Sequence, residues 1–349
     1  MGPLPRGLSL RAKNCITHAA VEKDEDLLIL CEEGYTDERI VDAIARTAKE
    51  KGARVTAVRC KPLTPGASEE PPRPVAAAMK SADVMIELFS HPLDHTTTHT
   101  EALFDYGLRY IMSIGWGGRS TVFNEASLWP VEVFYQIRRR VYEKMVSHKT
   151  ARLIDGKGTD LTVKINPYHV TGGFGPISHP GEFGIFPPGS VLVHPNFSGD
   201  GVAYCDGFHM FGNTAQPIKL TFEKGWCTGI EGGLEARRLR EMIGGVKNWG
   251  YFDELSLGLN PKIKVDRRKG KGVGSLMHAG MIHVGIGDSR LDGGRVFSKV
   301  HVDGWFHRSS LFLDDEEVVT DARVNLFNDT DLLEKISQYG PPQVLLKNV

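Results

Sequence analysis

Apolar and polar positions follow two different patterns along the chain. Up to about residue 150, short apolar runs such as LLILC (27–31) and DVMIELF (83–89) are separated by stretches with helical spacing, of which DERIVDAIARTAKEKG (37–52) is the clearest. Strands that alternate with helices are typical of a parallel sheet with right-handed crossovers. We therefore predict that residues 1–150 form an α/β domain built on a parallel sheet.

Beyond residue 150, glycine and proline divide the chain into short alternating runs, among them DLTVKI, FGIFPPGSVLV, PIKLTFEKGWCTGI and KVHVDGWF. Only one stretch with helical spacing, residues 234–245, interrupts them. Frequent turns between short alternating runs indicate antiparallel strands. The second predicted domain, residues 151–349, is therefore a β-rich α+β domain.

Composition narrows the class of protein. A chain of 349 residues can form two domains with cores of their own. A formal net charge of -1 argues against binding nucleic acid through net charge. The five cysteines have no C-x-x-C spacing, which favours reduced thiols in a cytoplasmic enzyme. The N-terminus lacks the apolar run of a signal peptide, and no segment approaches the roughly 20 apolar residues of a membrane span.

The run KVHVDGWF contains a potential pair of metal ligands. In a strand, residues two apart point to the same face, so His301 and Asp303 lie side by side. Borderline divalent metals accept both imidazole and carboxylate ligands. The alternative is a surface strand on which the two polar side chains face water.

Three further residues of the second half lie in apolar, glycine-containing segments: Glu182, Glu254 and His283. A carboxylate buried in such a segment is costly unless a metal or a partner compensates its charge. Alternatively, the glutamates are exposed at strand ends and His283 is a hydrogen-bonded core residue. Taken with His301 and Asp303, the set predicts a site for one or two divalent metals, and Zn, Mn, Co and Fe(II) are all compatible with it.

A histidine cluster, HPLDHTTTH (91–99), follows the strand predicted at 83–89. His91, His95 and His99 would share one face of a helix. Pro92 favours a loop position for His91, at the end of a strand where open α/β sheets place ligands. A histidine there can transfer protons near neutral pH, whereas the alternative is a polar loop residue.

Several segments resemble one enzyme family. EKGWCTGIEGGLEA, followed by LGLNP and the H-x-D pair, is similar to the 2,5-dihydroxypyridine 5,6-dioxygenases, which are related to the thermophilic-type leucyl aminopeptidases. The dioxygenase resemblance implies a homo-oligomer and a mononuclear iron(II). Its implied ligands are a histidine where this chain has Glu254, and a histidine and an aspartate that match His301 and Asp303. A loop histidine matching His91 is implied to do acid/base work.

The aminopeptidase branch implies a different ligand set. It carries a glutamate at the position of Glu254 and a histidine that matches His283. It also uses an earlier glutamate in a segment similar to GEFGIFPP, which supplies Glu182.

Two reaction classes follow from these candidates. We favour a hydrolase in which a metal-activated water attacks an amide or a ring C–N bond, with Glu182 or Glu254 as general base. The alternative is an iron(II) dioxygenase that cleaves a hydroxylated N-heteroaromatic ring, with His283, His301 and a carboxylate as ligands. A third possibility is a member of the fold that only binds. The aromatic residues Phe183, Phe186, Trp226, Trp305 and Phe306 lean towards a small aromatic substrate.

Overall fold

The computed structural model contains a sheet of five parallel strands and a larger antiparallel sheet. It describes residues 7–61, 69–90, 93–113, 125–171, 175–265, 276–291 and 293–347. The chain divides into two compact units. The N-terminal unit comprises Met1–Tyr135 and Gly173–Pro188, and the β-rich unit comprises Gln136–Gly172 and Gly189–Val349.

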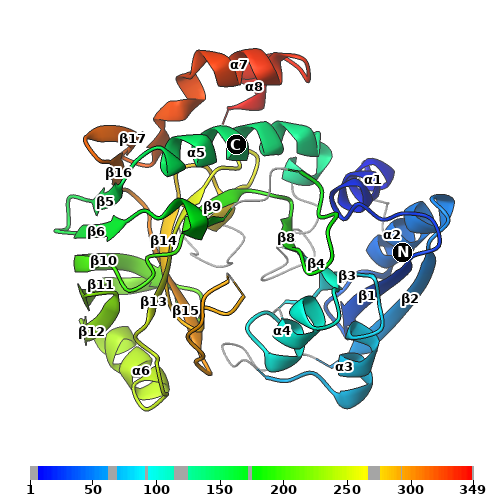
Figure 1. Ribbon diagram of the computed structural model, residues 1–349, viewed down its shortest axis with the longest axis horizontal. Coiled ribbons are helices and arrows are strands. Elements are labelled where there is room, and N and C mark those ends of the chain that lie inside the picture. Colours follow the sequence, from blue (N-terminus) through cyan, green and yellow to red (C-terminus); the bar gives the residue numbers. More distant parts are fainter. Residues whose placement is uncertain are drawn as a thin grey trace. The chain divides into compact units, whose positions relative to one another are not determined.

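The parallel sheet of the N-terminal unit has the strand order β2-β1-β3-β4-β8. Helices α1 and α2 cover one face of this sheet, and α3 and α4 cover the other (Figure 1). The predicted α/β architecture is confirmed. The elements are β1 (Asp26–Glu32), β2 (Arg54–Cys60), β3 (Val84–Leu88), β4 (Arg109–Ser113), β8 (Phe183–Phe186), α1 (Leu8–His18), α2 (Glu38–Glu50), α3 (Arg73–Met79) and α4 (Thr97–Phe104).

Local sequence explains these elements. Strands β3 and β4 are buried along their whole length, because helices lie on both faces, and β3 therefore appears in the sequence as a nearly continuous apolar run. Helix α2 begins after Asp37, whose side chain accepts a hydrogen bond from the Arg39 N–H at 3.0 Å. It ends just before Gly52, which has φ 92°, a conformation that glycine adopts without a steric penalty.

The run FGIFPPGSVLV is split between the two sheets. Its first part forms β8, which pairs with β4 in the N-terminal unit, and its last part forms β9 in the β-rich unit. Pro187 and Pro188 separate the two strands, because proline has no N–H to donate to a strand ladder. The sequence pattern placed this whole run in the β-rich second domain, and that prediction is wrong for β8.

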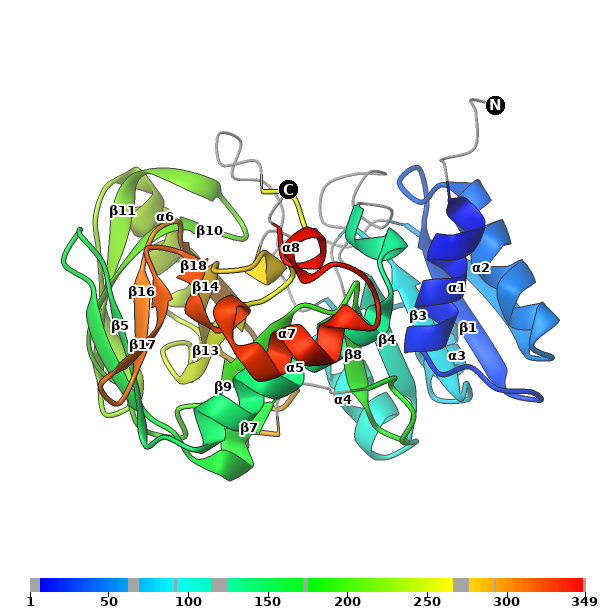
Figure 2. The ribbon, with the colours of Figure 1, turned by 90° about the horizontal axis from the view of Figure 1, so that it is seen from above.

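The β-rich unit contains a large, curled antiparallel sheet, as the sequence predicted (Figures 1 and 2). Its strands follow the order β18-β17-β16-β5-β6-β10-β15-β14-β13-β9-β7, with β11 pairing with β10 and β12. They are β5 (Thr150–Ile154), β6 (Asp160–Lys164), β7 (Val170–Thr171), β9 (Ser190–Val193), β10 (Asp200–Phe208), β11 (Gly212–Glu223), β12 (Trp226–Glu231), β13 (Phe252–Gly258), β14 (Ile282–Gly287), β15 (His301–Phe306), β16 (Ser310–Leu313), β17 (Glu316–Thr320) and β18 (Arg323–Val324).

Further α-helices are α5 (Val131–Val146), α6 (Leu234–Ile243), α7 (Thr330–Ser337) and α8 (Pro342–Leu345). Helix α6 corresponds to the one predicted at 234–245 and packs against β11 and β12. Helix α5 lies beside α7 (Figure 2). There Arg140 forms an ion pair with Asp329, the residue whose side chain caps α7.

Candidate metal centre

Three neighbouring central strands of the β-rich unit carry the candidate ligands. Glu254 on β13 lies opposite Gly285 on β14, and Gly285 lies opposite Asp303 on β15. His301 precedes Asp303 by two residues on β15, so the alternation of the strand places both side chains on one face. His283 lies two residues before Gly285 on β14, on that same face.

Gly285 makes room for the side chains on either side of it. A Cβ atom at this position would lie 2.6 Å from Cγ of Glu254 and 3.1 Å from Cε1 of His301. Real Cβ atoms do not approach side-chain carbons to 2.6 Å, so only glycine allows the two flanking strands to direct their ligands over β14.

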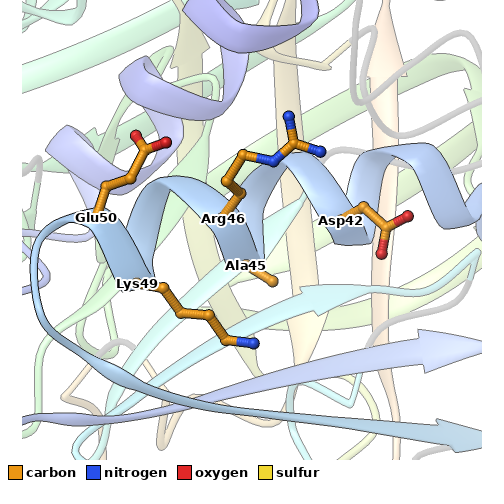
Figure 3. Close-up of a pocket in the computed structure, with 5 residues that line it drawn as sticks. All are labelled: Asp42, Ala45, Arg46, Lys49 and Glu50. Atoms are coloured by element: carbon orange, nitrogen blue, oxygen red, sulfur yellow. The ribbon is translucent and has the colours of Figure 1, made fainter.

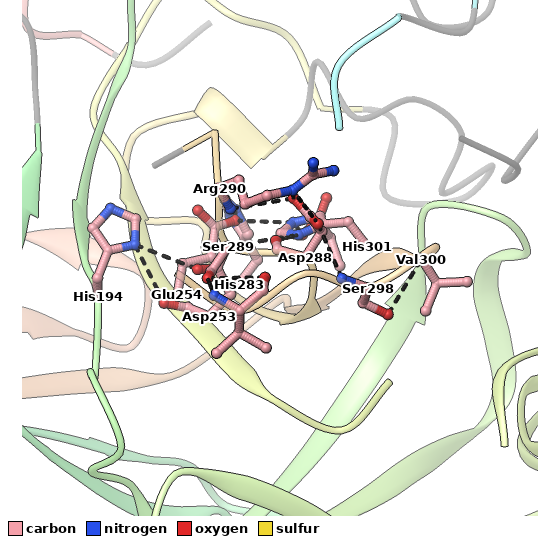
Figure 4. Close-up of polar contacts among 12 residues, drawn as sticks. His194, Asp253, Glu254, His283, Asp288, Ser289, Arg290, Ser298, Val300 and His301 are labelled. Atoms are coloured by element: carbon pink, nitrogen blue, oxygen red, sulfur yellow. Dashed lines mark hydrogen bonds and ion pairs between the residues drawn. The ribbon is translucent and has the colours of Figure 1, made fainter. Parts of the chain in front are cut away.

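The polar atoms of this set converge. The His301 Nε2 atom lies 3.1 Å from Oδ1 of Asp303 and 3.8 Å from Oε1 of Glu254. The His283 Nε2 atom lies 3.0 Å from the same Glu254 oxygen (Figure 4). Candidate ligand atoms of Glu254, His301 and Asp303 all lie within 4.8 Å of one another, which is the spacing of donors around one cation.

Opposite charges stabilise the cluster of Glu254, His283, His301 and Asp303. Burial alone would raise the pKa of the Glu254 carboxyl, but His283 and His301 outweigh it and hold that pKa well below its usual range. Burial likewise opposes the charge of His301, yet Asp303 and Glu254 raise the pKa of its imidazole well above the usual range. The buried groups therefore hold protons between carboxylates, and a divalent cation would replace those protons.

The ring of His301 has the orientation of a metal ligand. Its Nδ1 atom lies 3.0 Å from the carbonyl oxygen of Asp288, which can only accept a hydrogen bond (Figure 4). In the neutral ring the proton is then on Nδ1, and the lone pair of Nε2 points towards Asp303 and Glu254. A histidine that donates its outer N–H to a carbonyl group is the usual arrangement in metal sites. The donor set of imidazoles and carboxylates therefore fits a divalent metal.

Two further site residues were predicted, Glu182 and His91. Glu182 belongs to the N-terminal unit, where its carboxylate accepts hydrogen bonds from the backbone N–H groups of Ser178 and His179 at 2.6 and 2.7 Å. His91 lies outside the described residues. Participation of Glu182 and His91 in the site stays a prediction.

The predicted helical face of three histidines is wrong for His95. Helix α4 begins at Thr97, and the Thr96 hydroxyl caps it by accepting a hydrogen bond from the His99 N–H at 3.1 Å. His95 precedes the cap with φ 61°. His99 is fully buried, with its ring centroid 4.5 Å from that of Tyr110, so it packs in the core.

Sequence reasoning missed Asp253, which is 2% exposed and lies beside the cluster. Neighbouring residues on a regular strand face opposite sides, so Asp253 and Glu254 would not be expected on one side. The register of β13 shifts between Phe252 and Glu254, and this bulge brings the Asp253 carboxylate to within 3.6 Å of the His301 Nδ1 atom. A bulge of this kind leaves little trace in the sequence.

Outside this cluster, the described residues also form a hollow on helix α2 that is lined by no histidine. This shallow hollow is lined by Ala45 and the charged side chains of Asp42, Arg46, Lys49 and Glu50 (Figure 3).

Of the aromatic residues proposed to contact substrate, Phe186, Trp305 and Phe306 are buried core residues. Among the described helices, none has the length and apolar character needed to cross a membrane.

Comparison with known proteins assigns the family. The family model described as 2,5-dihydroxypyridine 5,6-dioxygenase matches residues 10–326, and the chain belongs to this family. A curated relative, the 2,5-dihydroxypyridine 5,6-dioxygenase of Pseudomonas putida, is 26% identical over 208 residues. That match covers 52% of this chain and 57% of the relative, so it spans little more than half of either protein.

Two solved structures share the fold. The 2,5-dihydroxypyridine dioxygenase from Pseudomonas putida superposes with a TM-score of 0.75 at 20% identity, over 92% of this chain and 98% of that one. AmpT from Thermus thermophilus superposes with a TM-score of 0.63 at 16% identity, over 92% and 99% of the two chains. These structures confirm the predicted fold class, and the family match confirms the predicted relationship to the dioxygenases.

These comparisons correct one expectation. The preference for a hydrolase over a dioxygenase is wrong, because both the matching family and the curated relative are dioxygenases. The abundance of carboxylates suggested metal-activated water, but Glu254 and Asp303 are also compatible with an oxygen-dependent metal centre.

Proposed function

We propose that this protein is a metal-dependent dioxygenase that cleaves the ring of a hydroxylated N-heteroaromatic compound such as a dihydroxypyridine. The observation that carries the proposal is the cluster of Glu254, His283, His301 and Asp303 in a chain of the dioxygenase family. The substrate class follows the name of the curated relative.

The proposed metal is iron(II), held by His301 and His283 and by one or both of the carboxylates of Asp303 and Glu254. Two histidines and one carboxylate leave open positions on non-haem iron. When bound, the iron would supply the redox centre for the reaction between dioxygen and the ring. His283 provides the second imidazole in this chain, since Glu254 stands where the family resemblance implies a histidine.

The residues of the chain have separate tasks in this proposal. His301 and Asp303 share one strand, so a single backbone segment fixes their spacing. The Glu254 Oε1 atom lies 3.0 Å from Nε2 of His283, so a cation held by these two side chains would take the place of the proton that they share in its absence. We assign proton transfer to His91, on the family resemblance, and retain Glu182 as a second candidate for this task.

Oxygen uptake tests the proposal. Protein purified without oxygen is loaded with iron(II), its metal content is measured by elemental analysis, and 2,5-dihydroxypyridine is added in an oxygen-electrode cell. We expect about one dioxygen consumed per ring lost, and no ring loss under argon. Ring turnover that continues under argon, or the absence of any oxygen uptake by iron-loaded protein, would contradict the proposal.

A pair of variants tests the unusual ligand position. Glu254→His recreates the ligand set implied by the resemblance, and we expect it to retain iron and measurable oxygen uptake. Glu254→Gln keeps the size of the side chain but removes the charge, and we expect weaker iron binding and at least a 10-fold slower uptake, the lower end of effects for ligand-sphere changes. Equal activity of the Gln variant and the native protein would place Glu254 outside the site.

A further inference from the structure

The outward-facing nitrogen of His301 has two acceptors, of which only one is a backbone group. Its Nδ1 atom lies 3.0 Å from the Asp288 carbonyl oxygen and 3.6 Å from Oδ2 of Asp253 (Figure 4). The Asp253 Oδ2 atom is buried and has no hydrogen-bond partner within the described ranges. A buried carboxylate oxygen without a hydrogen bond is costly, so its place near an imidazole N–H requires an explanation.

The Asp288 carbonyl group is held in place by its own side chain. The Asp288 carboxylate accepts hydrogen bonds from the Ser298 N–H at 3.0 Å and from Nε of Arg290 at 2.9 Å. The Asp288 N–H donates to the Val300 carbonyl oxygen at 2.8 Å. These bonds fix the turn before β15, so the carbonyl oxygen stays in line with the His301 ring.

The other oxygen of Asp253 is also engaged. Its Oδ1 atom lies 3.8 Å from Nδ1 of His194, a ring that also contacts the Asp253 carbonyl oxygen at 3.2 Å and the Thr171 hydroxyl at 3.0 Å. The Asp253 carboxylate is thus enclosed between two histidines, on the side of His301 opposite Asp303 and Glu254.

We propose that Asp253 is a positioning residue of the metal centre, which acts through the Nδ1–H group of His301. This inference rests on the metal site of the proposed function. A cation on Nε2 increases the positive charge of the ring, and the Asp253 carboxylate, 3.6 Å from Nδ1, stabilises that charge electrostatically. Asp253 thereby increases the basicity of His301 as a ligand, while the Asp288 carbonyl group fixes the tautomer and the plane of the ring.

The test removes the negative charge of Asp253 without changing the size of its side chain. Asp253→Asn removes the carboxylate charge, and Asp155→Asn is the matched control in the same unit. The Asp155 side chain is 1% exposed, but its contacts are Lys157 and the Thr159 N–H, and neither residue is a candidate ligand. Metal-free protein is titrated with Co(II) against a competing chelator, without substrate or oxygen.

We expect Asp253→Asn to bind Co(II) about 10- to 100-fold more weakly than the native protein, the range typical of outer partners of metal ligands. Asp155→Asn should match the native affinity. Proton NMR of the Co(II) protein gives a second measurement, because the Nδ1–H of a ligating histidine gives a shifted, exchangeable resonance. In Asp253→Asn this resonance should move and exchange faster with water.

Native Co(II) affinity with an unmoved resonance in Asp253→Asn would overturn the inference. Circular dichroism establishes whether each variant is folded. If Asp253→Asn does not fold, Asp253→Glu decides, because it keeps the charge but alters the contact, and an unmoved resonance there would also overturn the inference. If Asp253→Asn binds Co(II) weakly but the native enzyme takes up no oxygen, the proposed function is refuted and the role of Asp253 at the metal centre stands. A native protein that binds no Co(II) would refute both.

Discussion

Each of the two units buries a strand glutamate, and the two glutamates differ in charge. Glu87 on β3 is 1% exposed and accepts hydrogen bonds from the Tyr110 hydroxyl and from the Leu93 N–H. Burial raises the pKa of its carboxyl to about 8. Glu254 on β13 is 5% exposed, yet its pKa lies well below the usual range, because His283 and His301 outweigh the effect of burial.

The difference lies in the partners. Neutral donors can satisfy the hydrogen bonds of a buried carboxyl but do not compensate its negative charge, so Glu87 is most stable when protonated. Imidazolium groups compensate the charge and keep Glu254 ionised. A buried acid is therefore a candidate metal ligand when its partners can exchange their protons for a cation, and a structural residue when they cannot.

The largest expected effect comes from breaking the charged cluster. His301→Ala and Asp303→Ala should each abolish binding of one metal equivalent, because each removes a ligand from the shared strand. Elemental analysis after anaerobic loading and gel filtration measures the loss. The control is Glu87→Gln, which alters the other buried glutamate and should keep the full equivalent. Full metal content in His301→Ala would show that the centre lies elsewhere.

A smaller effect is expected from filling the space between the ligands. In Gly285→Ala the new Cβ would meet Glu254 and His301, and overpacking of this kind costs about 1–3 kcal/mol. We expect lower stability in urea unfolding and at least a 10-fold loss of metal affinity, because the ligands must move apart. Gly245→Ala is the matched control, since nothing lies within 4 Å of its new Cβ. Equal behaviour of the two variants would contradict the role given to Gly285.

The prediction with the smallest effect on the metal centre concerns pH and the N-terminal unit. Between the unfolded pKa of Glu87, near 4.5, and its folded pKa of about 8, the folded state holds a proton that the unfolded state lacks. The contribution of Glu87 to the free energy of unfolding therefore falls as pH rises through this window, by at most about 1.4 kcal/mol per pH unit, and levels off above pH 8. Glu87→Gln should remove this slope.

Urea unfolding of the native protein and of Glu87→Gln at pH 5, 6, 7 and 8 measures the pH dependence of the free energy of unfolding. The difference in unfolding free energy between the two proteins should shift steadily in favour of the variant as pH rises. A difference that is constant with pH would mean that Glu87 is ionised in both states, and the contrast with Glu254 would disappear.

Sequence patterns predicted the sheets better than the helices around them. Strands β1 and β3 were predictable because burial on both faces leaves a continuous apolar run. Helix α1 was not predicted, because polar residues such as Arg11 and His18 are buried in it and obscure the apolar stripe. Strand β8 was assigned to the wrong part of the fold, since a short apolar strand fits either sheet and only its partner β4 decides.

For the site, local alternation was sufficient for His301 and Asp303, which share a strand. Glu254 and His283 come from other strands, and their convergence depends on the register around Gly285, which local pattern does not encode. The position of Asp253 beside the site could not be predicted, because it depends on the bulge in β13. The type of reaction could not be deduced from ligand counts, because the same carboxylates and histidines bind hydrolytic and oxygen-activating metals.

Strand β14 is hydrogen-bonded to β13 on one side and to β15 on the other, and all six of its residues are buried. Backbone amides in such a position exchange with solvent only through openings that cost nearly the full free energy of unfolding. The ligand-bearing strands therefore keep their mutual register unless the unit unfolds. We infer that the centre is reloadable: a chelator can remove the ion, and a fresh ion can enter, without any refolding of the strands that hold it.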